Sequence, residues 1–159
     1  MSGAALRVAI AGNHAYMANG TNGLQLIDVS NPAAPQLAGR QPTTNSVGDV
    51  GLSGNHAFVT ETTHDGPIGG RWLLSVIDIS DSTNPKKIGS VDLDDYPCSQ
   101  PRLAVAGDFL YVAGGGQGLL VFAIRDPANP RQVGYLDIVS FAVAVSGNWR
   151  TWQIHFVHS

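Results

Sequence analysis

One short phrase occurs three times in this sequence, and the repeat constrains the fold more than any other feature. The copies read LIDVSNPAAPQLAG from position 26, VIDISDSTNPKKIG from position 76 and VFAIRDPANPRQVG from position 121. In each copy an apolar run leads into a turn of constant length that ends on a proline, with a glycine four residues later. Asn, Asp and Pro favour turns because short polar side chains bond to nearby backbone and proline fixes φ. We therefore assign the phrase to architecture rather than to chemistry.

A second repeated element precedes each phrase, a Gly-Asn or Gly-Asp pair between two short apolar runs. Such a pair indicates a two-residue β-hairpin with glycine at its first central position. The hairpin glycines Gly12, Gly54, Gly107 and Gly147 are 42, 53 and 40 residues apart. A period of about 40 to 45 residues with several strands per unit is typical of β-propeller blades.

Each unit is expected to contain four strands, of which the third is apolar on both faces, as in LLSVIDI at 73–79. Strands of this kind are covered on both sides, and propeller blades stack face to face. Only 13% of the residues are charged, whereas glycine and proline are plentiful, which favours short strands and turns over helices. We therefore predict an all-β fold, a single partial β-propeller domain over residues 1–159. The expected blades span about residues 6–40, 47–92 and 103–137, with an incomplete fourth blade at about 141–159.

The repeats resemble those of the LVIVD-repeat family. The resemblance is carried by LQLIDVSNPAAPQLAG and LSVIDISDSTNPKKIG, and by hairpins that lead into HAYMA, HAFVT or FLYVA. It implies a β-propeller of bacterial or archaeal origin, often exported or attached to the cell surface, and it carries over no catalytic residue. The third copy departs from the pattern, because Ala123 and Arg125 stand where the others have Asp and Ser. We expect its turn to be stabilised differently.

Composition excludes several classes of function. The formal net charge of -3 gives no basic surface for nucleic acid. The single cysteine, Cys98, excludes an internal disulfide and a cysteine-based zinc site. No apolar run approaches the roughly 20 residues of a membrane-spanning helix. The first residues have no basic region ahead of an apolar run, so no signal peptide is predicted. We expect either a cytoplasmic protein or a first Met that is internal to a longer reading frame with its export signal upstream.

Length variation between the repeats points to one face of the propeller. Strands alternate in direction, so the loops between strands two and three and between blades emerge at the same end. The second unit has the longest loops of both kinds, at 61–72 and 93–102. Insertions on one face of a repeat protein are typical of a binding surface, and aromatic and arginine side chains dominate such surfaces. The candidate binding residues are His64, Asp65, Arg71, Trp72, Asp94, Asp95 and Tyr96. The alternative is that Trp72 packs in the core and the charged residues are simply solvated.

Other chemical signals are weak. Asp92, Asp94 and Asp95 lack the spacing and glycine of a calcium loop. His14 and His56 occupy equivalent repeat positions, which favours a structural role over metal binding. No metalloprotease or serine-hydrolase motif is present. We therefore predict no catalytic residue, no metal and no cofactor.

Three blades and part of a fourth do not close a ring, since propellers have four to eight blades. The tail WRTWQIHFVHS at 149–159 alternates like an edge strand, or it is the altered end of a truncated gene. We expect a fragment of a larger exported or surface protein. The alternative is a homodimer that closes a six-bladed ring.

The expected function is non-catalytic binding or scaffolding, with a protein or carbohydrate as ligand. The alternative function is that of a propeller enzyme, a lyase or hydrolase whose site lies mostly in missing blades. An enzyme site would require titratable groups from several blades to converge at the central channel.

Overall fold

The computed structural model describes residues 5–63, 71–93, 101–114, 118–139, 142–146 and 153–156. In these segments the chain forms three four-stranded antiparallel sheets and one two-stranded sheet. In each four-stranded sheet the strands are ordered as they occur in the sequence. The predicted all-β propeller fold is thus confirmed.

Each four-stranded sheet corresponds to one repeat and is called a blade below. Blade 1 contains β1 (Arg7–Ala11), β2 (His14–Ala18), β3 (Leu24–Asp28) and β4 (Gln36–Gln41). Blade 2 contains β5 (Ser46–Ser53), β6 (His56–Thr62), β7 (Trp72–Asp78) and β8 (Lys86–Asp92). Blade 3 contains β9 (Arg102–Ala106), β10 (Phe109–Ala113), β11 (Leu119–Ala123) and β12 (Arg131–Leu136). The two-stranded sheet pairs β13 (Val143–Ser146) with β14 (Gln153–Phe156).

The first two strands of each blade are joined by the predicted tight hairpin. Its first residue is Gly12, Gly54 or Gly107, with φ of 56°, 54° and 54°. This left-handed conformation is easy for glycine and costly for residues with a Cβ. The expected fourth hairpin at Gly147 is wrong, because Ser146 pairs with Gln153 and six residues separate the strands. There the sequence no longer follows the HAYMA-like pattern of the other repeats.

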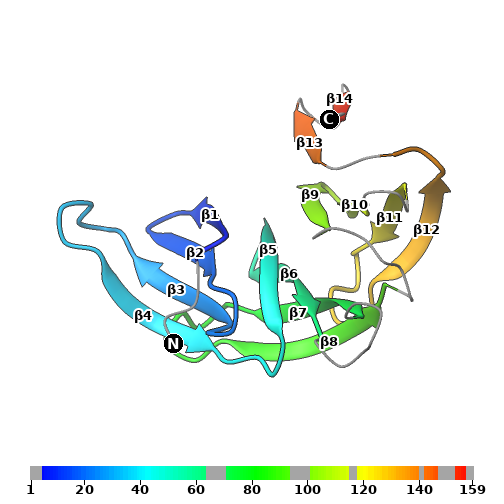
Figure 1. Ribbon diagram of the computed structural model, residues 1–159. Helices are drawn as coiled ribbons and strands as arrows, with labels where there is room; N and C mark the ends of the chain where they lie inside the picture. The colour runs from blue at the N-terminus through cyan, green and yellow to red at the C-terminus, as the bar shows by residue number, and fades with distance from the viewer. Residues whose placement is uncertain are drawn as a thin grey trace.

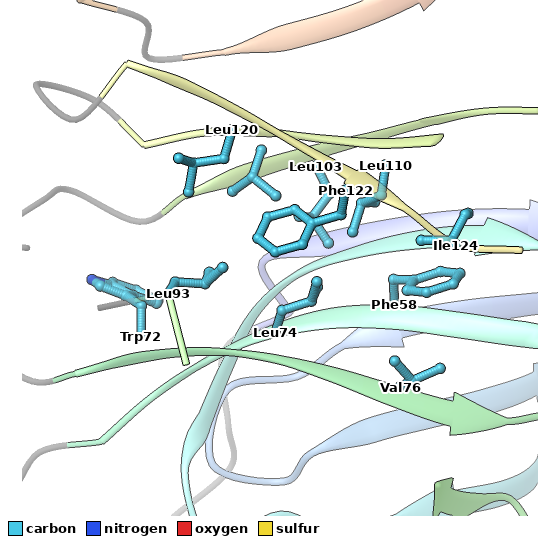
Figure 2. Close-up of a cluster of buried hydrophobic side chains, with 11 residues drawn as sticks. Phe58, Trp72, Leu74, Val76, Leu93, Leu103, Leu110, Leu120, Phe122 and Ile124 are labelled. Carbon is cyan, nitrogen blue, oxygen red and sulfur yellow. The ribbon is translucent and has the colours of Figure 1, made fainter. Parts of the chain in front are cut away.

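The blades stack side by side along an arc, with β1, β5, β9 and β13 toward its inner side and β4, β8 and β12 along the outside (Figure 1). Blade 2 is covered on both faces. Phe58 and Leu74 point toward blade 3, in the cluster shown in Figure 2, whereas Val59 and Ile77 belong to the cluster shared with blade 1. Each such buried side chain contributes roughly 1.5–3 kcal/mol. The third strand of this repeat is therefore buried on both faces, as its composition predicted.

A backbone contact fixes the spacing between blades. A Cβ atom built on Gly39 in β4 would lie 2.2 Å from the carbonyl oxygen of Ser82, in the turn between the third and fourth strands of blade 2. One built on Gly89 in β8 would lie 2.2 Å from the carbonyl oxygen of Ala128, in the equivalent turn of blade 3. The repeated glycine thus lies beneath the turn of the following blade.

The N-terminal end of the arc exposes an apolar face. Val8 is 60% exposed, whereas Val50 and Leu103, four residues before their hairpin glycines like Val8, are 7% and 9% exposed. Both buried residues pack against the preceding blade. Around Val8, a depression of about 470 Å³ is also lined by Leu6 and Met17. Among the residues that the structure describes, no preceding blade covers this face.

Candidate functional site

The two ends of the strands differ in how their polar groups are used. The turn end is the end of each blade that carries the hairpin and the turn between the third and fourth strands. There, Asp28 Oδ1 accepts a hydrogen bond from the Ser30 N–H at 2.8 Å, and Asp78 Oδ1 accepts one from the Ser80 N–H at 2.9 Å. These hydrogen bonds hold the pKa of both carboxyl groups below its ordinary value.

The third blade stabilises its turn end by a different bond, as the sequence predicted. Ala123 replaces the aspartate, and Arg125 Nε instead donates to Asp108 Oδ2 at 2.7 Å. Asp108 lies in the hairpin, where the other blades have asparagine. Carboxylates of all three blades are therefore committed to local bonds at the turn end.

The two histidines at the turn end lie opposite aspartates of the neighbouring strand. His14 lies directly opposite Asp28, and His56 directly opposite Asp78, on neighbouring strands. The equivalent pair in blade 3 has no charged member. Within the described segments, no group of three or more His, Cys, Asp or Glu side chains could hold a metal ion.

The opposite end of the strands, called the loop end, carries the two long loops of blade 2. Thr62 pairs with Trp72, and Leu73 pairs with Asp92, so the ends of both loops lie together. Arg71 Nη2 lies 3.0 Å from Asp92 Oδ2 and joins them by an ion pair. Exposed pairs of this kind contribute about 0–1 kcal/mol. The expectation that the two loops emerge at the same end is met.

Two of the candidate binding residues, Trp72 and Arg71, fall in the described segments. Trp72 is 7% exposed and lies beside Leu93 in the cluster between blades 2 and 3 (Figure 2). Of the two readings of Trp72, the one in which it packs in the core is confirmed, because Trp72 begins β7 and packs with the core-facing side chains of that strand. Arg71 is exposed and paired with Asp92. The remaining candidates lie outside the described residues: His64, Asp65, Asp94, Asp95 and Tyr96.

The structure reveals a row of charged residues that sequence reasoning missed. Arg7, Asp49 and Arg102 each lie five residues before the hairpin glycine of their blade. They are on the first strands of three consecutive blades, near the loop end. Counting back from each hairpin glycine would have found them, since the next three positions of each strand are apolar or glycine. We call these three residues the charged row.

Asp49 lies at the centre of the charged row and is buried. Its Oδ1 accepts a hydrogen bond from the Val50 N–H at 2.8 Å, and its Oδ2 accepts one from the Leu103 N–H at 3.0 Å. Burial raises the pKa of the Asp49 carboxyl, against the effect of these bonds and of Arg102 and Arg7. Asp49 thereby links the first strands of blades 2 and 3.

The loop end also contains polar atoms that are buried without a partner. Among the described residues, Arg102 Nη1 and Asn19 Oδ1 are buried and make no hydrogen bond. An unpaired buried donor or acceptor costs about 1–3 kcal/mol. By contrast, the buried Glu61 carboxylate is partnered on both oxygens, by Lys87 Nζ at 3.3 Å and Asn45 Nδ2 at 3.2 Å. Glu61 is thus a structural residue, whereas Arg102 has unused capacity to donate.

None of the described segments forms an apolar helix of the length needed to cross a membrane.

Comparison with known proteins agrees with this architecture. The computationally designed Ika4 protein superposes with a TM-score of 0.63 at 14% identity, over 99% of this chain and 94% of that chain. The Cps50 (Swd1) β-propeller domain of Myceliophteria thermophila also gives 0.63, at 11% identity, over 97% of this chain and 54% of that chain. At such identities the likeness shows the fold alone.

No curated protein matches the sequence. The LVIVD repeat matches residues 2–43, 68–93 and 100–138, which is more than half of the chain. The chain therefore belongs to the LVIVD repeat family.

Proposed function

We propose that this chain is a non-catalytic binding module that engages its ligand at the loop end. The observation that carries the proposal is the charged row, in which consecutive blades place Arg7, Asp49 and Arg102 side by side at this end. Carboxylates of the turn end are used in local bonds, whereas Arg102 has an unpartnered donor among the described residues. Binding residues in repeat folds gather on one such face.

The chemistry of the charged row favours binding over catalysis. Titratable groups from several blades do meet there, as a lyase or hydrolase would require. However, arginine remains protonated at any working pH and cannot act as a general base. Both oxygens of Asp49 accept backbone N–H groups. The two arginines are therefore suited to hold an anion in place, and the charged row is poorly suited to transfer a proton.

The proposed ligand is a protein or a carbohydrate, and the proposed setting is a larger exported or cell-surface protein. The setting is supported by the family resemblance. The ligand classes are supported by the type of surface, in which Arg71 and Asp92 form an exposed ion pair beside the two long loops.

A binding screen tests the proposed function. Immobilised protein would be exposed to acidic and neutral oligosaccharides and peptides, and affinities would be measured by biolayer interferometry. We expect a ligand whose affinity decreases about tenfold in Arg102→Gln, since bonds to charged groups contribute about 1.5–3 kcal/mol. Arg131→Gln is the matched control, because Arg131 is exposed at the turn end, where β12 begins. Ligands that bind both variants equally, or that are cleaved, would contradict the proposal.

A further inference from the structure

The charged row contains more positive than negative charge. Arg7 Nε lies 3.9 Å from Asp49 Oδ1, and the charge of Arg102 also acts on the Asp49 carboxyl. Two guanidinium groups are thus drawn toward one carboxylate. The two guanidinium groups and the ionised Asp49 carboxylate together carry a net charge of one unit positive. An additional anion near this net positive charge would be stabilising.

Neither arginine is hydrogen-bonded to Asp49 within the part of the chain that the structure describes. The distance from Arg7 exceeds the 2.7–3.2 Å typical of a hydrogen bond. The Asp49 oxygens instead accept the Val50 and Leu103 N–H groups. Arg102 Nη1 is buried and unpartnered among these residues, and the Arg7 side chain is 49% exposed. The row therefore combines excess positive charge with unused donors.

We propose that Arg7 and Arg102 form a subsite for one oxyanion group of the ligand, with Asp49 as the positioning residue between them. A guanidinium presents N–H donors in a planar fork that matches the oxygens of a carboxylate or a phosphate. Asp49 is fixed by backbone bonds from Val50 of its own blade and from Leu103, which follows Arg102 in blade 3, and its Oδ1 lies 3.9 Å from Arg7 Nε. This inference rests on the proposed function and specifies the chemistry of its ligand.

The rival explanation is that the two arginines only neutralise a buried carboxylate. In that case the row stabilises the fold, but anions have no specific effect. The two explanations therefore differ in the response to added anion rather than in the stability of a variant.

The test uses inorganic phosphate as the probe, in the full chain at constant ionic strength with chloride as the reference anion. We expect a saturable rise in melting temperature with phosphate, from which Kd follows. Arg102→Gln should weaken phosphate binding about tenfold or more. Arg102→Lys should restore part of it, because lysine keeps the charge but not the fork. Arg131→Gln should leave Kd unchanged.

A second measurement needs no Arg102 variant, in case Arg102 variants fail to fold. In a phosphate titration followed by NMR, the backbone amide of Leu103 should shift saturably, because it bonds to Asp49, whereas the amide of Gly12 at the turn end should not. Phosphate responses that are absent, or equal in wild type and Arg7→Gln, would overturn the subsite.

The two proposals can fail separately. A ligand from the screen that depends on Arg102 while phosphate does not bind would leave the binding function and remove the oxyanion subsite. Specific phosphate binding with no ligand from the screen would keep the oxyanion subsite and remove the proposed protein or carbohydrate ligand.

Discussion

Replacement of Gly89 by alanine should force blades 2 and 3 apart. The new methyl group would lie 2.2 Å from the Ala128 carbonyl oxygen, against ordinary contacts of 3.4–4 Å, so the turn must retreat by about 1 Å. Overpacking costs typically 1–3 kcal/mol. The upper end applies because the obstacle is backbone, held by the Asn129 N–H to Asp126 carbonyl bond of 3.1 Å. Alanine recovers about 0.4–1 kcal/mol by restricting the unfolded chain. The net loss is about 2 kcal/mol, or roughly thirtyfold in the folded-to-unfolded ratio.

Urea unfolding followed by circular dichroism would measure this loss as a shift in midpoint at constant m. Gly134→Ala is the matched control, since the nearest described atom to its Cβ position is Val121 Cβ at 3.3 Å in the same blade. We expect Gly134→Ala to change the free energy of unfolding by about 0.5 kcal/mol or less. Equal losses in the two variants would refute the argument that the turn of the next blade presses on the repeated glycine.

Three further predictions concern the core, the turn end and the exposed apolar face at the N-terminal end of the arc. Phe58→Ala should cost about 3–5 kcal/mol in urea unfolding, since Phe58 is fully buried; a loss below 1 kcal/mol would contradict its placement. The hydrogen bond from the Ser80 N–H lowers the folded-state pKa of Asp78. The stabilisation of the fold by this bond is therefore present above about pH 4 and is lost as the pH falls through the lowered pKa. Melting temperatures of Asp78→Asn and wild type should therefore converge at low pH, and a constant difference would argue against this. Val8→Thr with Ile10→Thr should reduce concentration-dependent association in light scattering, because both side chains are exposed; unchanged association would place the contact elsewhere.

Local signals in the sequence predicted most of the fold. The hairpin glycines and the turn of constant length recur in register, and each depends on the conformation of only a few neighbouring residues. The altered turn of blade 3 was also predicted, because Ala123 and Arg125 replace the usual residues at known positions. Strand pairing in each blade joins neighbours in sequence, so the order of strands followed from the repeat.

The candidate site was harder to predict because it depends on contacts between blades. For Trp72 the sequence left two readings open, a loop residue or a core residue. It lies two residues before Leu74 and thus on the same face of the strand, and this alternation favours the core. The charged row is different: its repeat position can be counted, but the meeting of Arg7, Asp49 and Arg102 depends on how blades stack. Stacking brings together residues that are far apart in sequence.

The contact between the repeated glycine and the next blade has a consequence for how such chains change over time. At Gly39 and at Gly89 the neighbouring group is a backbone carbonyl, of Ser82 and of Ala128, and not a particular side chain. Because this contact is made by backbone, it does not depend on which side chains the neighbouring turn carries. Gene duplication could add a blade, and deletion could remove one, without a matching mutation at this contact. The loops of each blade would then be free to differ in length, as those of the second blade do.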